Sequence, residues 1–279
     1  MADPRLSRGG TAGGGFTDKP GAWVDLALTL PIFIGYQLGV VFLRVKNASD
    51  LVTGPLMRLA NGSRLNYLAM TLAIGVVFAG VFAMLGRGHA FRMGKFVQIA
   101  IEGAVYAVVM RMGANYVVGR LPMSSWMFGL GPRVACVLRP GPQTLVSIAD
   151  ASPLGGDPVT GLVMSLGAGF YEELAFRVVL FGLGAKVLVS LLARERMSLV
   201  ESGPRLTFKG FFIMVVWALA SAAVFSGVHY IGALGDPFQI GSFVFRFVLG
   251  LALTLIFVTR GFAAAVWTHA LYDAWVLVL

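Results

Sequence analysis

The sequence predicts an all-α fold, a polytopic transmembrane helical bundle of about seven spans, within a range of six to eight. Of the 279 residues, 57% are hydrophobic and only 13% are charged, and the mean hydropathy is +0.81. Soluble domains carry about 25% charged and 45–50% apolar residues. Apolar runs of the roughly 20 residues that a membrane crossing requires follow one another along most of the chain.

The chain divides into three predicted parts. Residues 1–21 are Gly-rich and polar, and we expect a disordered cytoplasmic tail there. Residues 22–160 are expected to form an N-terminal transmembrane region, and residues 161–279 a C-terminal transmembrane core. The first apolar run lacks a small-residue cleavage site, so we expect a retained helix rather than a signal peptide. A Pro/Gly-rich connection, Arg120–Thr160, joins the two regions, and its middle could hold an interfacial or re-entrant helix.

Seven segments are expected to cross the membrane. The third is the weakest because Glu102 and Arg111 interrupt it, and Pro31 is expected to kink the first. The fourth is longer than one crossing requires, so we expect it to tilt, bend or break near Gly182 or Gly184. The segments are about Ala22–Val45, Tyr67–Leu85, Phe96–Val118, Gly161–Ala193, Gly210–Val228, Ile240–Thr259 and Gly261–Leu279.

The net charge of +9 is explained by membrane orientation rather than by nucleic-acid binding, because no basic-aromatic array suited to bases is present. The loop Arg194–Lys209 holds four basic residues and is predicted to be cytoplasmic, whereas Tyr230–Gln239 holds none. Alternation then places the N-terminus in the cytoplasm and the C-terminus outside. The composition of the tail favours a prokaryotic inner membrane, with the lipid bilayer itself as a partner.

Three ionisable residues lie close together in the fourth span. Such residues are costly within a membrane and indicate function by default. On an α-helix adjacent side chains point about 100° apart, so Glu172 and Glu173 are not expected to serve the same partner. Glu173 and Arg177 are four apart and are expected to pair. Glu172 then faces the bundle interior, where a carboxylate suits the work of a general base.

Two histidines and an aspartate lie in the spans that follow. His229 ends the fifth span, and His269 and Asp273 are four apart on one face of the seventh. Together with Glu172, this set fits either a base-activated water with an oxyanion site or a metal bound by nitrogen and oxygen ligands.

Three ordered motifs carry a resemblance to a known family. They are "EELAFR" from Glu172, "FSGVH" ending at His229, and "HALYD" from His269. They resemble the CPBP family of CAAX proteases and bacteriocin-processing enzymes, also called Abi, which includes the type II CAAX prenyl endopeptidases. The resemblance covers about Gly161–Leu279. It implies an intramembrane endopeptidase whose helical bundle encloses a membrane-embedded catalytic cavity.

The same resemblance implies a role for each site residue. Glu172 activates a water, His229 assists it, and His269 with Asp273 stabilises the oxyanion, while Glu173 and Arg177 give structural support. The family was first described as metalloproteases and is now often described as glutamic proteases. We therefore expect no metal. Zinc bound by Glu172, His229, His269 and Asp273 is the alternative.

Asp273 departs from the CAAX-processing branch, which has asparagine at this position. An ionised aspartate cannot donate a hydrogen bond to an oxyanion. Asp273 therefore stays protonated, orients His269 or binds a metal. Arg246, on the sixth span, either pairs with a carboxylate of this cluster or has a structural role.

The expected substrate is a membrane-associated or exported protein or peptide, and the myxosortase-type branch is one place in the family for this chain. The opposing interpretation is a non-catalytic membrane scaffold or bacteriocin-immunity protein on the same fold. A buried polar network that fixes helix packing and a proton-coupled transporter are further alternatives.

Overall fold

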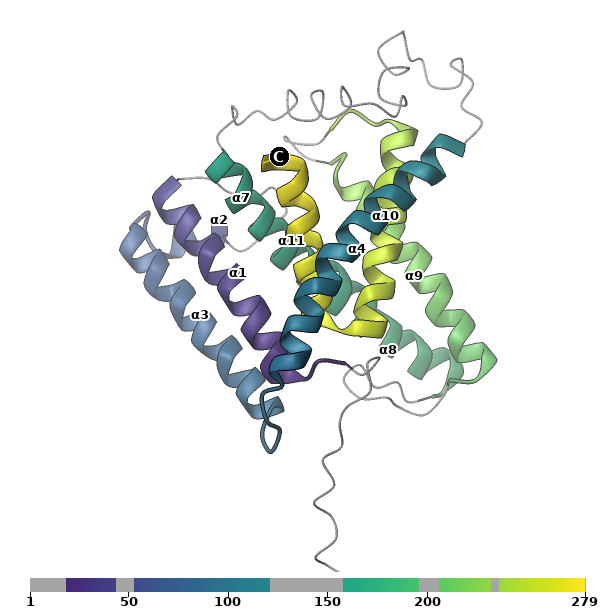
Figure 1. Ribbon diagram of the computed structural model, residues 1–279, viewed down its shortest axis with the longest axis horizontal. Helices are drawn as coiled ribbons and strands as arrows, with labels where there is room; N and C mark the ends of the chain where they lie inside the picture. The colour runs from purple at the N-terminus through teal and green to yellow at the C-terminus, as the bar shows by residue number, and fades with distance from the viewer. Residues whose placement is uncertain (1–18, 44–52, 121–157, 196–205, 232–235, 279) are drawn as a thin grey trace, which may run out of the picture.

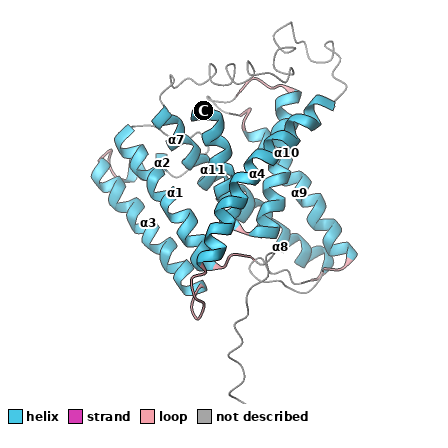
Figure 2. Ribbon diagram, viewed as in Figure 1, coloured by secondary structure: helices cyan, strands magenta, loops and turns pink. Residues whose placement is uncertain are grey.

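A computed structural model describes residues 19–43, 53–120, 158–195, 206–231 and 236–278. Every regular element in these ranges is a helix (Figure 2). The all-α class predicted from composition is therefore confirmed. The predicted tail before residue 19 and the predicted interfacial helix within 121–157 lie outside the described residues.

The helices follow the predicted order closely. Six of those described are long and apolar enough to cross a membrane, and a seventh apolar helix, α11, is shorter at 17 residues. This agrees with the predicted range of six to eight spans. The elements are α1 (Ala22–Leu43), α2 (Thr53–Leu59), α3 (Arg64–Leu85), α4 (Met93–Arg120), α7 (Pro158–Gly167), η2 (Ala168–Leu183), α8 (Gly184–Leu188), η3 (Val189–Ala193), α9 (Phe208–Val228), α10 (Ile240–Arg260) and α11 (Phe262–Val278).

The fourth span is one helix of 36 residues, Pro158–Ala193, in which the hydrogen-bonding pattern changes. Its middle part, η2, is a π-helix with i→i+5 hydrogen bonds, a form that is frequent at functional sites. The chain does not leave the helical conformation near Gly182 or Gly184. Instead, the pattern returns to that of an α-helix at Gly184. The fourth span is therefore longer than one membrane crossing requires and yet remains a continuous helix. Helix α1 likewise continues through Pro31.

Helix α11 lies in the centre of the bundle. It packs against α1, α4, α7, η2 and α10, and the four residues Ala263–Val266 are fully buried. Because protein rather than lipid surrounds it, α11 need not span the full hydrocarbon thickness. A single residue, Gly261, separates it from α10 with φ +95°, a conformation that glycine adopts without strain. The Asp25 carboxylate accepts a hydrogen bond from the Ala263 N–H at 3.2 Å and so caps this helix from α1.

The two ends of the bundle can be followed in Figure 1. The first residues of α1 lie beside the turn after α3, because Arg92 donates hydrogen bonds to the carbonyls of Lys19 and Pro20 and the Trp23 indole donates to Gly86. The sequence predicts that the N-terminus is cytoplasmic, so this end of the bundle is the predicted cytoplasmic end. The C-terminal end of α11 lies at the opposite end of the bundle.

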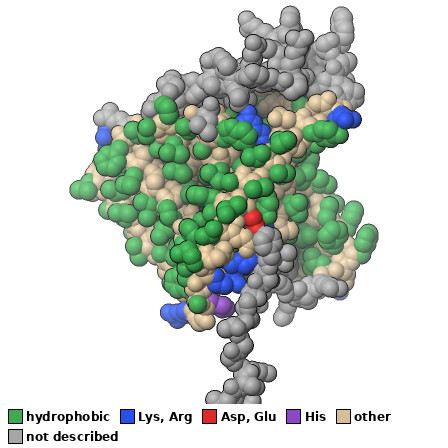
Figure 3. All heavy atoms as spheres, viewed as in Figure 1, with side chains coloured by type: hydrophobic (Ala, Val, Ile, Leu, Met, Phe, Trp, Pro, Cys, Tyr) green, Lys and Arg blue, Asp and Glu red, His purple; other side chains and the backbone are tan. Residues whose placement is uncertain are grey.

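Hydrophobic side chains cover the sides of the molecule. Figure 3 shows one such face, where the visible basic side chains lie toward the two ends. Helix α3 contributes strongly to this coat, with Leu72, Val76 and Val77 all exposed. An apolar belt between basic ends is the surface expected of a protein that spans a bilayer.

Candidate active site

The predicted site residues Glu172, His229 and His269 come together from η2, the end of α9 and α11. The Glu172 Oε2 atom lies 3.8 Å from His269 Nε2 and 4.0 Å from His229 Nε2. Glu172 and His269 are both only 5% exposed. A carboxylate thus faces two imidazole nitrogens in the buried interior. His229 and His269 follow Glu172 by 57 and 97 positions in the sequence, so it is tertiary packing that brings the three side chains together.

A close approach of two helices makes this geometry possible. A Cβ atom added at Gly169 of η2 would lie 2.7 Å from the Ala270 Cβ and 2.8 Å from its backbone nitrogen. Only glycine allows η2 and α11 to pack at this distance. Because His269 precedes Ala270, the same contact brings its imidazole to the glutamates of η2.

The predicted pair of Glu173 and Arg177 is present and fully buried. Glu173 Oε2 lies 3.1 Å from Arg177 Nε, and the side chains are 0% and 1% exposed. The other oxygen, Oε1, lies 2.7 Å from His269 Nδ1 and hydrogen-bonds to it. Glu173 therefore orients His269 so that the Nε2 edge faces Glu172, in addition to pairing with Arg177.

The prediction that Glu172 and Glu173 serve different partners is wrong. Both contact His269, one at each ring nitrogen. An angle of about 100° between adjacent side chains holds for an α-helix, whereas η2 is a wider π-helix in which neighbouring side chains diverge less. An imidazole also offers nitrogens on two edges, so one ring can accept two adjacent carboxylates.

His229 is oriented by its own helix. Its Nδ1 atom lies 2.9 Å from the Phe225 carbonyl, four residues earlier, to which the Nδ1–H donates. The Nε2 atom is thereby directed at Glu172. In the neutral ring this leaves Nε2 as an acceptor.

Phe225 is a site residue that the sequence reasoning missed. Its ring lies 5.3 Å from the His229 ring and 6.2 Å from the His269 ring, both edge to face. The Arg177 guanidinium lies 4.3 Å from the same ring, a cation–π contact. The signal was available, since Phe225 is the first residue of the F-x-x-x-H motif and shares a helical face with His229.

Asp273 and His229 form the more open edge of the site. Their side chains are 20% and 25% exposed, whereas that of Glu172 is 6% exposed. Asp273 Oδ2 lies 3.5 Å from His269 Nε2, which confirms that the two residues share a helical face. Asp273 lies in the C-terminal half of α11, and His229 directly follows the last residue of α9.

Arg246 does not pair with a carboxylate of the cluster. Its Nη2 atom lies 2.5 Å from Oδ2 of Asp236, which belongs to the segment between α9 and α10. Its guanidinium also lies 5.4 Å from the ring of Tyr230. Arg246 thus holds Asp236 and Tyr230, which lie between α9 and α10, against α10.

The chemistry of the side chains matches part of a zinc site, because Glu172, His229 and His269 offer ligand types that zinc accepts. The Glu173–His269 hydrogen bond also resembles the outer-shell contact that orients metal-binding histidines. However, within the described residues no group of three or more His, Cys, Asp and Glu side chains is arranged to hold a metal ion.

Comparison with known protein families identifies the C-terminal region. Residues 155–275 match the family model described as type II CAAX prenyl endopeptidase, Rce1-like. The resemblance predicted from the three motifs is therefore confirmed over this segment, which contains α7 to α11. Together with the six candidate spans, the match identifies an integral membrane protein with a protease-type helical core. Searches of curated proteins and of solved structures found no match to this chain.

Proposed function

We propose that this protein is an intramembrane endopeptidase that hydrolyses a peptide bond of a membrane-associated or exported protein. The observation that carries the proposal is the position of Glu172, a buried carboxylate that faces the Nε2 atoms of His229 and His269 at 4.0 and 3.8 Å. These distances are longer than a direct hydrogen bond. A water molecule between Glu172 and His229 could donate a hydrogen bond to each of these two side chains.

In the proposed reaction, Glu172 removes a proton from that water as its oxygen attacks the scissile carbonyl carbon. The carbonyl oxygen becomes an oxyanion in a tetrahedral intermediate. When the C–N bond breaks, the proton passes from Glu172 or His229 to the leaving nitrogen. The products are a carboxyl group and an amine, so one water is consumed for each bond cleaved.

His269 is proposed to stabilise the oxyanion. Its Nδ1–H is held by Glu173, and in the imidazolium form its Nε2–H can be donated to the developing negative charge. Asp273, 3.5 Å from the same nitrogen, is proposed to orient this edge rather than to donate to the oxyanion itself. Arg177 balances the charge of Glu173, so that the two acidic side chains of η2 are not left to repel one another.

The more open edge of the site indicates the membrane face from which substrates are proposed to enter. His229 and Asp273 lie toward the end of the bundle that the charge distribution predicts to be external. Substrates would therefore enter from outside the cytoplasm, which suits exported or lipid-anchored proteins. The prokaryotic inner membrane, with the N-terminus in the cytoplasm, is the location we propose.

The proposed reaction requires no metal, and zinc is the alternative cofactor. If zinc bound by Glu172, His229, His269 and Asp273 drives the reaction, a strong chelator should abolish cleavage and zinc should restore it. Our proposal expects cleavage by the purified protein to be unaffected by chelation. Metal analysis of the active preparation provides an independent readout.

The proposal is tested by comparing protein termini in the membrane and secreted proteomes of four strains. These are wild type, a deletion, Glu172→Gln, and Glu195→Gln as a control that changes an exposed carboxylate to an amide. We expect the deletion and Glu172→Gln to accumulate the same uncleaved precursors and Glu195→Gln to match wild type. If Glu172→Gln behaves as wild type while the deletion has a phenotype, the scaffold or immunity interpretation replaces the enzyme.

A further inference from the structure

A chain of buried hydrogen bonds links the N-terminal helices to η2. Gln37 of α1 donates from Nε2 to the Tyr171 hydroxyl at 2.5 Å and accepts at Oε1 from the Tyr67 hydroxyl, also at 2.5 Å. Tyr67 of α3 in turn lies 2.9 Å from the hydroxyl of Thr53 at the start of α2. Tyr171 immediately precedes Glu172. The polar chain thus ends one residue from the proposed catalytic base.

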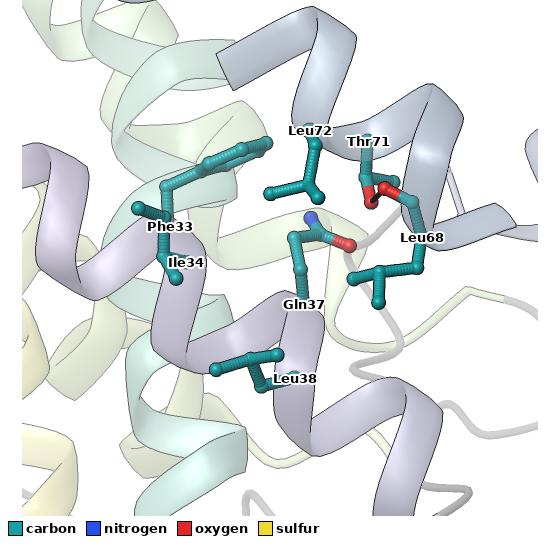
Figure 4. Close-up of a pocket in the computed structure, with 7 residues that line it drawn as sticks. All are labelled: Phe33, Ile34, Gln37, Leu38, Leu68, Thr71 and Leu72. Atoms are coloured by element: carbon teal, nitrogen blue, oxygen red, sulfur yellow. Dashed lines mark hydrogen bonds between the residues drawn. The ribbon is translucent and has the colours of Figure 1, made fainter. Parts of the chain in front are cut away.

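All four members of this chain are buried among apolar groups. Gln37, Tyr67, Thr53 and Tyr171 are 2%, 0%, 4% and 8% exposed. Figure 4 shows Gln37 projecting from α1 toward α3, where the residues around it are Phe33, Ile34, Leu38, Leu68, Thr71 and Leu72. A polar group buried in such surroundings is costly unless hydrogen-bonded, so the amide of Gln37 has a strong preference for this one arrangement.

The ring of Tyr171 is held by α1 as well. It lies 5.5 Å from the Tyr36 ring in an edge-to-face arrangement and 6.5 Å from the Phe33 ring. Helix α1 therefore fixes both the ring and the hydroxyl of Tyr171. These contacts come from outside residues 155–275, the segment that matches the family model.

We propose that Gln37 is a positioning residue for the reaction, which acts through Tyr171 to hold Glu172 in its orientation toward His229 and His269. This inference rests on the proposed function. It assigns a role in catalysis to the N-terminal helices, which carry none of the three motifs. A purely structural role would lower stability without a selective effect on turnover, because polar contacts between membrane helices also serve packing.

The test uses full-length protein reconstituted in phospholipid vesicles and a fluorogenic peptide spanning a cleavage site found by the comparison of termini. Gln37→Met removes both hydrogen bonds at similar volume, and Tyr171→Phe removes only a hydroxyl. Thr29→Val is the matched control, since Thr29 is fully buried on the same helix but its hydroxyl donates within α1, to Asp25. We measure kcat, KM and thermal stability for each variant and for the Gln37→Met/Tyr171→Phe double variant.

We expect kcat to fall about tenfold in Gln37→Met and in Tyr171→Phe with KM unchanged, because a small displacement of a reacting group slows the chemical step. The double variant should lose no more than either single one, since both remove the same link. Thr29→Val should keep the wild-type kcat. If Gln37→Met does not fold, the kcat of Tyr171→Phe decides the question.

Three outcomes overturn the inference: an equal loss of kcat in Thr29→Val, a rise in KM alone, or full additivity in the double variant. Glu172→Gln in the same assay separates this inference from the proposed function. If Glu172→Gln is inactive while Gln37→Met and Tyr171→Phe turn over as wild type, only the positioning role fails. If Glu172→Gln cleaves the peptide normally, the proposed function itself fails.

Discussion

Two ion pairs within the helical bundle look alike but belong to different kinds of site. Glu173 and Arg177 are four residues apart on η2, and Glu173 also holds His269. Glu102 of α4 pairs with Arg260 of α10, 158 positions away, through two contacts of 2.7 Å. The first pair supports the candidate active site, and the second ties two helices together.

The difference lies in what surrounds each carboxylate. Glu102 accepts further hydrogen bonds from Gln98 at 2.6 Å and from Tyr106 at 3.2 Å, so its two oxygens are engaged by structural donors. By contrast, Glu173 holds Nδ1 of His269 at 2.7 Å, and Nε2 of the same imidazole faces Glu172 at 3.8 Å. The two pairs therefore differ in what their carboxylates hold in place: Glu102 holds groups of the helix packing, whereas Glu173 holds a residue of the candidate site.

The largest effect is expected on the catalytic side of this comparison. Glu173→Gln removes the negative charge that holds both His269 and Arg177, and we expect turnover to fall about 10- to 100-fold, the loss typical of residues that orient metal-binding histidines. Leaving Arg177 buried without its partner should also destabilise the protein by about 3–5 kcal/mol. Peptide cleavage per folded molecule and unfolding in detergent measure the two effects. Wild-type turnover in this variant would contradict the orienting role of Glu173.

The structural pair should show the opposite pattern. Glu102→Gln removes the carboxylate charge with which Arg260 pairs, and we expect a loss of stability of about 1–3 kcal/mol. Cleavage per folded molecule should stay at the wild-type level, because Glu102 does not contact the site. The double variant Glu102→Leu/Arg260→Met should recover much of the lost stability, since neither charge then remains buried. A selective loss of turnover in Glu102→Gln would remove the distinction between the two pairs.

A smaller effect is expected at the open edge of the site. Asp273→Asn keeps an oxygen that can face His269 Nε2, and it adds an N–H that can donate to an oxyanion. We expect turnover to stay within about tenfold of wild type, much less than the 10²- to 10³-fold loss typical of deleting an oxyanion donor. Asp273→Leu, which removes both functions, should fall in that larger range. Equal losses in the two variants would show that the charge of Asp273 is required.

The smallest effect is expected at an exposed carboxylate outside the spans. Hydrogen bonds from the hydroxyl and the backbone N–H of Thr207 hold the pKa of Glu195 below its ordinary value of 4.5. A lowered pKa in the folded state means that the ionised form stabilises the protein above that ordinary value and that this contribution is lost as the pH falls through the folded pKa.

Thermal unfolding of wild type and Glu195→Gln, followed between about pH 3 and pH 7, measures this contribution. We expect wild type to be slightly more stable at neutral pH and the difference to vanish in acid, because the carboxyl is then protonated in both states. A difference that persists unchanged at the lowest pH would show that the Thr207 contacts do not depend on the charge.

Local patterns were sufficient for the helices and for most of the site. Hydropathy located seven apolar helices, and spacing alone predicted the Glu173–Arg177 pair and the common face of His269 and Asp273. These features depend on residues within one or two helical turns. The Glu173–His269 hydrogen bond and the Glu102–Arg260 pair could not be predicted, because each joins helices whose relative position no local pattern specifies.

The sequence by itself determined that this chain is a helical membrane protein whose C-terminal region resembles CAAX proteases, and it predicted Glu172, His229, His269 and Asp273 as the candidate site. Composition and short-range spacing contain that information. Only the tertiary structure decided which ring nitrogen each glutamate meets, that the Phe225 ring contacts Arg177 and both histidines, and that α1 contacts η2 through Gln37. Those outcomes depend on how η2 packs against α1, α9 and α11, because no local pattern in the sequence specifies the relative position of separate helices.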